Sequence, residues 1–245
     1  MRIGIPREIK SAERRVGLTP SSVAELVLDG HDVFLESEAG GGIDAADRDY
    51  EAAGATVLPS ADAVFEEATL IVKVKEPLAE ERARLQPHHT LFTYLHLAPD
   101  AEQTKDLVAS GATCIAYETV TDARGGLPLL APMSQVAGRM SIQAGAHSLE
   151  SAQGGAGLLL GGVPGVAPAR VVVLGGGVVG SNAIQLALGL GADVTVLDRN
   201  TSVLEALSAR FGSGLRTVYS TASVLAEYVH DADLVVGAVL VKGAA

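Results

Sequence analysis

The sequence predicts an α/β protein with two parallel-sheet domains, and three observations lead to this fold class. Short aliphatic segments alternate with amphipathic segments from the first residue onward, which is typical of parallel strands joined by crossover helices. The alternation stops near residue 125 and resumes at Arg170. The length of 245 residues is sufficient for two domains of modest size. Because aromatic residues make up 4% of the chain and tryptophan is absent, we expect aliphatic cores.

The first half opens with the strand-like segment RIGIP, and a helix start follows at Thr19-Pro20. Threonine is a favourable N-cap and proline a favourable first helical residue, and Gly30 marks the end of this helix. The later segments of this half repeat the pattern. They comprise strands at HDVFLE, TLIVKVKEP, HTLFTYLHL and ATCIAYET, and helices at AADRDYEAAG, ADAVFEEA and DAEQTKDLVASG.

A segment without the strand–helix alternation separates the two halves. The segment RGGLPLLAP is loop-like, whereas residues 133–153 lack proline and predict a helix of roughly 30 Å at about 1.5 Å per residue. In the glycine-rich stretch that follows, residues 154–168, the pair Pro164-Gly165 suits a type II turn in a hairpin, and a flexible linker is the alternative. We therefore expect a first domain at 1–130, a connecting helix at 131–153 and a second domain at 154–245.

The second half restores the alternation of strand and helix patterns. Strands are expected at RVVVLGG, ADVTVLD, LRTVYS and ADLVVGAVLV, and helices at VVGSNAIQLALGLG, SVLEALSARFG and ASVLAEYVHD. The two halves together therefore predict two Rossmann-like domains with a long helix between them.

A GxGxxG pattern at Gly175, Gly177 and Gly180 lies between the first strand and the first helix of the second half. Gly175 permits a tight turn, Gly177 lets the backbone approach a pyrophosphate, and Gly180 allows close packing of helix and strand. The next strand ends in Asp198, close to the spacing at which an acid accepts hydrogen bonds from a ribose. This acid favours NAD over NADP, although the adjacent Arg199 could weaken the preference. The alternative is a plain strand-to-helix turn that needs glycine for steric reasons.

Charged residues in the first half are candidates for binding and catalysis. Arg15 precedes a helix and could clamp a carboxylate, while Lys75 and His96 end neighbouring strands and could meet at one edge of a sheet. A histidine that titrates near neutrality suits acid–base chemistry. Lys73 lies two residues before Lys75, so we expect both lysines on one face of a strand. The alternatives are surface charge for Arg15, a solvated strand end for Lys75 and a core histidine for His96.

Bulk properties restrict the partners. A formal net charge of -11 disfavours nucleic acid. Cys114 lies in an apolar segment and we interpret it as packing. No segment approaches the roughly 20 apolar residues of a membrane span, and the first ten residues lack a signal-peptide core, so we expect a cytoplasmic protein without membrane contact. No metal site is predicted.

Several motifs together resemble the bacterial alanine dehydrogenases along the whole chain. They are MRIGIPREIKSAERRVGLTP, VKVKEP, LFTYLHLA, IAYETV, LPLLAPMSQVAGRMSIQAGA, GGVPGVAPA and DLVVGAVLV. The NAD-binding subunit of proton-translocating transhydrogenase shares RIGIPRE and the glycine-rich turn. That sister group typically lacks the lysine of KEP and the histidine of LHL, so this sequence resembles the dehydrogenase branch.

The resemblance implies a role for each candidate. Lys75 contacts the substrate oxo or amino group, His96 is the acid–base group, and Arg15 holds the substrate carboxylate. No role follows for Lys73, for which a salt bridge or a packed stem is expected. The residues expected to contact NAD are Ser134, Gly175, Gly177, Val178, Val179, Gly180, Asp198, Ser220, Val239 and Leu240.

The implied reaction is the reversible oxidative deamination of L-alanine to pyruvate and ammonia, in a homo-oligomer that is usually a hexamer. Family members continue for more than a hundred residues beyond this point, and they usually have proline where this chain has Lys242. We therefore expect a C-terminally truncated version of the family. A catalytically impaired NAD-binding or assembly protein and a transhydrogenase-like subunit are the alternatives.

Overall fold

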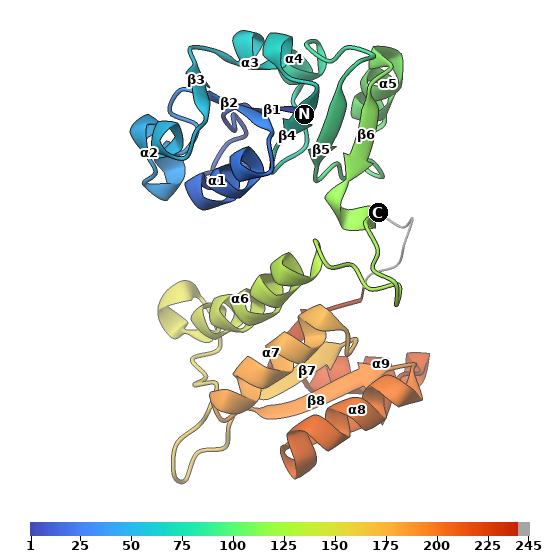
Figure 1. Ribbon diagram of the computed structural model, residues 1–245. Helices are drawn as coiled ribbons and strands as arrows, with labels where there is room; N and C mark the ends of the chain where they lie inside the picture. The colour runs from blue at the N-terminus through green and yellow to red at the C-terminus, as the bar shows by residue number, and fades with distance from the viewer. Residues whose placement is uncertain (240–245) are drawn as a thin grey trace. The chain divides into compact units, whose positions relative to one another are not determined.

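The computed structural model describes residues 1–239, which form two compact units (Figure 1). The first unit comprises Met1–Leu129, and the second begins at Leu130. Each unit contains one parallel β-sheet with helices between successive strands. The α/β fold class predicted from the sequence is therefore confirmed.

The first unit is built on a six-stranded parallel sheet with the order β3-β2-β1-β4-β5-β6. The order reverses between β1 and β4, where Ile3 of β1 pairs with both Val33 and Leu70. Ligands of open α/β sheets bind beyond the carboxyl ends of the strands at such a reversal. The strands are β1 (Arg2–Ile5), β2 (Asp32–Glu36), β3 (Thr56–Leu58), β4 (Leu70–Val72), β5 (Thr90–Thr93) and β6 (Thr113–Ala116).

The helices of this unit begin largely where the sequence indicates. Helix α1 has Thr19 as its N-cap, whose side chain accepts a hydrogen bond from the Ser22 N–H, and Pro20 as its first residue. Helix α5 ends at Ser110 and is followed by the C-cap Gly111, which has a φ of 69°. The helices are α1 (Pro20–Leu28), α2 (Asp47–Ala52), α3 (Ala61–Glu67), α4 (Ala79–Arg82) and α5 (Ala101–Ser110), with short 3-10 helices η1 (Gly41–Ile43) and η2 (Tyr117–Thr119). The short elements β3 and α4 were not predicted.

Strand β4 ends earlier than predicted, and this overturns the expected arrangement of the two lysines. The strand stops at Val72, so neither Lys73 nor Lys75 lies in it and the argument from a shared strand face is wrong. The ladder with β1 includes Ile71 and goes no further, although Ile5 of β1 still pairs with Leu35 of β2. The next backbone N–H on that side, that of Val74, donates to the Glu8 carboxylate instead.

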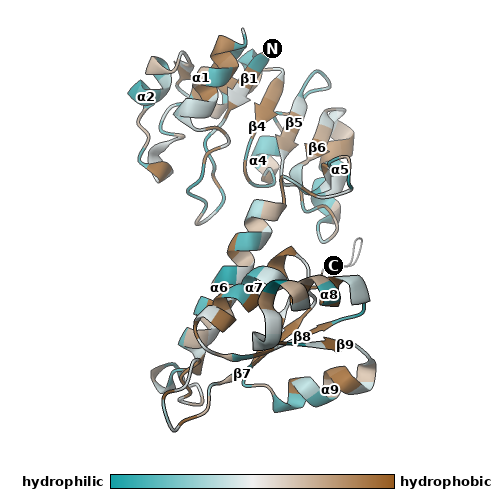
Figure 2. Ribbon diagram, turned by 60° about the horizontal axis from the view of Figure 1, so that its bottom comes forward, coloured by the Kyte–Doolittle hydropathy of each residue, from teal (hydrophilic) through white to brown (hydrophobic). Residues whose placement is uncertain are grey.

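The hydrophobic core of the first unit is mainly aliphatic, as expected. One cluster packs around Ile3, Ile5 and Leu35, and a second around Ile71 and Leu91. Figure 2 shows strands β4 and β5 largely in the hydrophobic colour, whereas the helices carry both kinds of residue. The sheet is thus a rigid, buried platform for the loops at its edges.

The second unit contains a four-stranded parallel sheet with the order β10-β7-β8-β9. Its strands are β7 (Arg170–Leu174), β8 (Asp193–Asp198), β9 (Leu215–Tyr219) and β10 (Leu234–Gly237). Its helices are α6 (Ala131–Leu149), α7 (Val178–Gly189), α8 (Thr201–Phe211) and α9 (Ala222–Asp231), with 3-10 helices η3 (Ser151–Gln153) and η4 (Gly212–Gly214). Helix α6 lies beside α7, as Figures 1 and 2 both show.

A long helix is present where the sequence predicts one, and it lies within the second unit, which begins at Leu130. The α-helical part ends at Leu149 rather than at residue 153, because Glu150 adopts extended backbone angles and only a 3-10 turn follows. In the stretch that follows, Val163 and Val166 exchange two backbone hydrogen bonds around Pro164-Gly165. The hairpin prediction is therefore confirmed at the turn, although the pairing is a single bridge.

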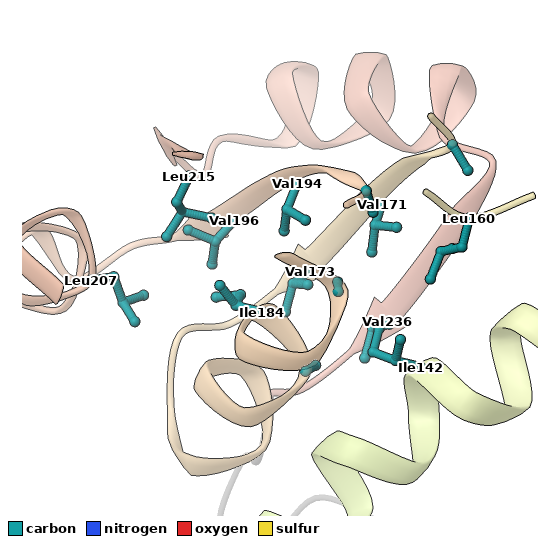
Figure 3. Packing of buried hydrophobic residues seen from close by; sticks show 14 of the residues in the cluster. Ile142, Leu160, Val171, Val173, Ile184, Val194, Val196, Leu207, Leu215 and Val236 are labelled. Carbon is teal, nitrogen blue, oxygen red and sulfur yellow. The ribbon is translucent and has the colours of Figure 1, made fainter. Parts of the chain in front are cut away.

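Aliphatic side chains from the strands and helices of the second unit form one core (Figure 3). Val171 and Val173 of β7 and Val194 and Val196 of β8 are completely buried, and α7 contributes Ile184. This packing fixes the strand ends of the sheet relative to the start of α7.

Among residues 1–239, no helix combines the length and the apolar character needed to cross a membrane.

Candidate functional site

The candidate catalytic residues of the first unit all lie beyond the carboxyl ends of its strands. Arg15 belongs to the loop after β1, Lys75 follows β4, and His96 follows β5. Because β1, β4 and β5 are consecutive parallel strands in the sheet, these three segments leave the same edge of the sheet side by side. The structure therefore brings the three segments together at the strand-order reversal.

Arg15 is held by Glu13 through three contacts. Its Nε and Nη2 atoms donate to the two carboxylate oxygens at 2.8 and 2.5 Å, and its backbone N–H donates to Glu13 Oε1 at 2.8 Å. The hydrogen bond from the Arg15 side chain lowers the pKa of Glu13 to about 2. The arginine side chain is 42% exposed, so the guanidinium is oriented by Glu13 while remaining accessible to a ligand.

Lys75 is fixed mainly through its backbone. Its carbonyl accepts a hydrogen bond from Thr93 Oγ1 at 2.9 Å, and its Nζ lies 3.5 Å from Glu76 Oε2. Burial raises the pKa of Glu76, but the hydrogen bond from Lys10 and the charge of Lys75 outweigh it and the net pKa is lowered. The Lys75 ammonium therefore stands beside an ionised carboxylate at the sheet edge.

His96 is exposed and has a left-handed backbone conformation with a φ of 48°. Its N–H donates to Glu118 Oε1 at 2.7 Å, and the preceding N–H of Leu95 donates to the same oxygen at 3.1 Å. Two successive N–H groups that converge on an anion stabilise such a conformation. The imidazole stacks on Tyr94 at a ring distance of 6.0 Å.

Several residues at this edge were not singled out from the sequence, although the quoted motifs contained most of them. Tyr94 donates from its hydroxyl to the Leu129 carbonyl at 2.6 Å, and its charged form would interact with Arg15. Glu13, Tyr94 and Glu118 hold the candidate residues, and each follows a strand in the sequence. Tyr94 and Glu118 come soon after strands β5 and β6, and that position was a signal available for finding them, whereas Glu13 lies further along the loop after β1.

The glycine-rich turn of the second unit has the form that a dinucleotide requires. Gly175 has a φ of 97°, a conformation that residues with a Cβ rarely adopt. A Cβ on Gly180 would lie 1.8 Å from the Gly175 carbonyl oxygen, so α7 can pack this close to β7 only with glycine at that position. A Cβ on Gly177 would meet nothing within 4 Å, which leaves open space at the N-terminus of α7. These features fit a pyrophosphate group.

Asp198 reaches back from the end of β8 to this turn. Its Oδ2 accepts a hydrogen bond from the Gly176 N–H at 2.7 Å, and its Oδ1 accepts one from the Asn200 N–H at 2.8 Å. A carboxylate has about four lone-pair positions, so the same oxygens can also accept ribose hydroxyls. Arg199 is exposed.

The other predicted cofactor residues surround the same turn, with one exception. Ser134 lies one helical turn before Gly138, whose added Cβ would meet the Val179 carbonyl oxygen in the first turn of α7. Ser220 follows β9 and donates its N–H to the Asp198 carbonyl. Val178 is 44% exposed and Val239 67% exposed, and Val239 lies against Gly175. Leu240 lies outside the described residues.

A parallel sheet with a glycine-rich turn into a helix and an acid at the end of the next strand is the architecture of a dinucleotide-binding protein. The chain belongs to the alanine dehydrogenase/PNT family. The model of the family's N-terminal domain matches residues 4–137, and that of its C-terminal domain matches residues 141–245. The resemblance inferred from the sequence is confirmed.

Similar proteins include alanine dehydrogenases from several organisms. The chain is 61% identical over 245 residues to that of Halomonas elongata and 54% identical over 244 residues to that of Mycolicibacterium smegmatis. These matches take in 100% of this chain, which spans 66% of the length of each of these relatives.

Two solved structures are similar over nearly the whole chain. An L-alanine dehydrogenase matches with a TM-score of 0.91 and 53% identity, covering 99% of this chain and 67% of that one. A transhydrogenase from Sinorhizobium meliloti matches with a TM-score of 0.80 and 26% identity, covering 100% of this chain and 71% of that one.

Proposed function

We propose that this protein is an NAD-dependent alanine dehydrogenase that interconverts L-alanine with pyruvate and ammonia. The observation that carries the proposal is the convergence of the Arg15, Lys75 and His96 segments at one sheet edge, in a chain 61% identical to an alanine dehydrogenase. An α-keto acid presents a carboxylate, a carbonyl oxygen and a site of proton transfer, and these three side chains correspond to the three groups.

The second unit would hold the cofactor. The turn from Gly175 to Gly180 and the N-terminus of α7 would bind the pyrophosphate, and Asp198 would accept hydrogen bonds from a ribose. A negative carboxylate there disfavours a 2′-phosphate, which supports NAD over NADP. When bound, NAD supplies an acceptor for the hydride from the substrate α-carbon.

The first unit would supply substrate binding and proton transfer. Arg15, oriented by Glu13, would hold the substrate carboxylate. The Lys75 ammonium would stabilise negative charge as it develops on the carbonyl oxygen. His96, with its backbone fixed by Glu118, would exchange protons with the amino and hydroxyl groups.

The test is NADH oxidation by the protein at its natural length in the presence of pyruvate and ammonium, with omission of ammonium as the blank. We expect Lys75→Ala to lower kcat by roughly 10²–10³-fold and His96→Ala by roughly 10²–10⁴-fold, with little change in NADH affinity. Lys105→Ala, which removes an exposed lysine from α5, is the matched control and should retain wild-type turnover.

Absence of ammonium-dependent turnover in the wild-type protein would overturn the enzyme assignment. If NADH still binds in calorimetry under those conditions, the protein is an NAD-binding member of the family without this activity. Turnover that survives in both Lys75→Ala and His96→Ala would show that the active residues lie elsewhere.

We further propose that the chain assembles with copies of itself. Val136 and Met140 lie one turn apart on α6 and are 55% and 51% exposed, and Leu159, Val163 and Val166 in the following stretch are all more than half exposed. Apolar side chains that stay this exposed on two successive segments favour contact with another protein surface. The resemblance to homo-oligomeric family members favours a second copy of the chain as the partner.

A further inference from the structure

Lys73 is a fully buried ammonium group for which the proposed reaction has no use. Its side chain is 1% exposed, and its Nζ lies 3.2 Å from Glu8 Oε2 and 2.6 Å from Glu81 Oε1. The two carboxylates are equally enclosed, with side-chain exposures of 3% and 4%. This cluster connects the loop after β1, the segment after β4 and helix α4.

Stability alone is a poor explanation for such a cluster. Removing charges from water costs several kcal/mol for each ion, and replacing buried ion pairs with packed apolar residues is often neutral or stabilising. Glu81 also caps α4, because its Oε2 accepts a hydrogen bond from the Leu78 N–H. That contact accounts for Glu81 but leaves the role of Glu8 open.

Glu8 uses its second oxygen on the backbone that leads into Lys75. Its Oε1 accepts the Val74 N–H at 2.6 Å and lies 3.4 Å from the Lys75 nitrogen. On the opposite side, the Val74 carbonyl accepts the Tyr94 N–H at 3.3 Å. The Glu8 carboxylate therefore accepts the hydrogen bond that a backbone carbonyl of β1 would accept if β1 and β4 were still paired at this point.

Lys73 supplies the positive charge that lets both carboxylates stay buried. Burial raises the pKa of Glu81 and outweighs the charge and hydrogen bond of Lys73, which lower it. Lys73 Nζ lies within ion-pair distance of both carboxylates, so its positive charge compensates that of Glu8 as well as that of Glu81. A neutralised carboxylate can stay buried and keep its backbone hydrogen bonds.

We propose that Glu8, neutralised by Lys73, is a positioning residue that fixes the Lys75 ammonium at the place where charge develops on the substrate oxygen. The inference rests on the proposed dehydrogenase function. Lys75 follows a strand that has already ended, so its position depends on the Glu8 hydrogen bonds and on Thr93. A misplacement of about 1 Å can cost roughly 10²-fold in rate.

The test is a double-mutant cycle between Glu8 and Lys75 in the protein at its natural length. Glu8→Ala should lower kcat for pyruvate amination by roughly 10²-fold and leave the KM for NADH unchanged. In a Lys75→Ala background the same change should have almost no further effect, because Glu8 acts through Lys75. Glu8→Gln, which retains an oxygen acceptor, should recover part of the lost rate and covers the case in which Glu8→Ala fails to fold.

Glu81→Gln is the matched control, because it removes the other carboxylate on Lys73 without touching the Lys75 backbone. It should lower the melting temperature while kcat stays close to that of the wild type. The inference is overturned if Glu8→Ala and Glu81→Gln lower kcat equally, or if Glu8→Ala costs the same in both Lys75 backgrounds. Failure of the proposed function gives a different result, since the wild type itself would then lack turnover.

Discussion

Glu13 and Arg15 form a local pair whose strength is set by three hydrogen bonds within a single loop. The carboxylate side chain is largely buried, whereas the guanidinium is partly open to solvent. The hydrogen bonds from Arg15 keep Glu13 ionised despite its burial, and the exposure of the guanidinium leaves part of the Arg15 surface for a ligand. The Glu13–Arg15 pair should therefore contribute to stability and also orient Arg15 for substrate binding.

The Glu13–Arg15 pair should make stability depend on acid pH. Because the pKa of Glu13 falls from 4.5 to about 2 on folding, its contribution is present above pH 4.5 and is lost as the pH falls toward 2. Allowing for solvent screening at Arg15, we expect on the order of 1 kcal/mol. Urea unfolding of the wild type and Glu13→Gln should give free energies that converge across this window. A difference that stays constant with pH would contradict the assignment, and an Arg15→Gln background should abolish the convergence.

Asp198 should determine the choice of cofactor. Asp198→Ala removes an acceptor for the ribose hydroxyls, so NADH should bind more weakly. It also removes a charge that repels a 2′-phosphate, so the difference between the NADH and NADPH affinities should become smaller. Calorimetry with both cofactors measures this. Asp193→Ala, at the other end of the same strand, makes the same change in charge and should leave both affinities unaltered. An unchanged preference in Asp198→Ala would show that its carboxylate does not face the ribose.

At the scale of elements, the contact between β7 and α7 depends on the absence of a single side chain. Gly180 is buried in the first turn of α7, where the helix approaches the Gly175 carbonyl. The glycine-rich turn can bring the helix N-terminus to a ligand only at this separation. The same helix contains a second glycine, Gly189, around which a Cβ would meet nothing.

The difference in space around Gly180 and Gly189 predicts that a glycine-to-alanine substitution has opposite effects on stability at the two positions. Gly180→Ala should push α7 away from β7, lowering both the melting temperature and the NADH affinity. Gly189→Ala should raise the free energy of unfolding by up to about 1 kcal/mol, because alanine restricts the unfolded chain and favours helix. Thermal melts and calorimetry on both variants check the prediction. Equal melting temperatures for the two variants would contradict the close packing of α7 against β7 at Gly180.

At the scale of the whole molecule, the exposed apolar residues of α6 and the stretch after it predict self-association. Light scattering at micromolar concentration should give a mass well above the 25.0 kDa of one chain. Val136→Glu with Met140→Glu should shift the protein toward the monomer, because charges would then have to be buried. Val108→Glu, at an isolated exposed position on α5, is the control and should not alter the mass. A wild-type mass near 25.0 kDa would refute the proposal.

The sequence by itself determined much about this protein. Strand and helix periodicity predicted the two parallel-sheet units, because buried strands and amphipathic helices have patterns that are local in the chain. Caps such as Thr19 and the turn at Gly175–Gly180 were also predictable, since their geometry depends on neighbouring residues. The family was recognisable from its ordered motifs.

Only the tertiary structure decided where β4 ends and what Lys73 does. The strand pattern continued through both lysines in the sequence, yet the ladder stops at the reversal of strand order. Glu8, Lys73 and Glu81 come from separate elements, so no local pattern could reveal that they meet. A buried charge is stable only beside its partners, and the fold alone brings those partners together.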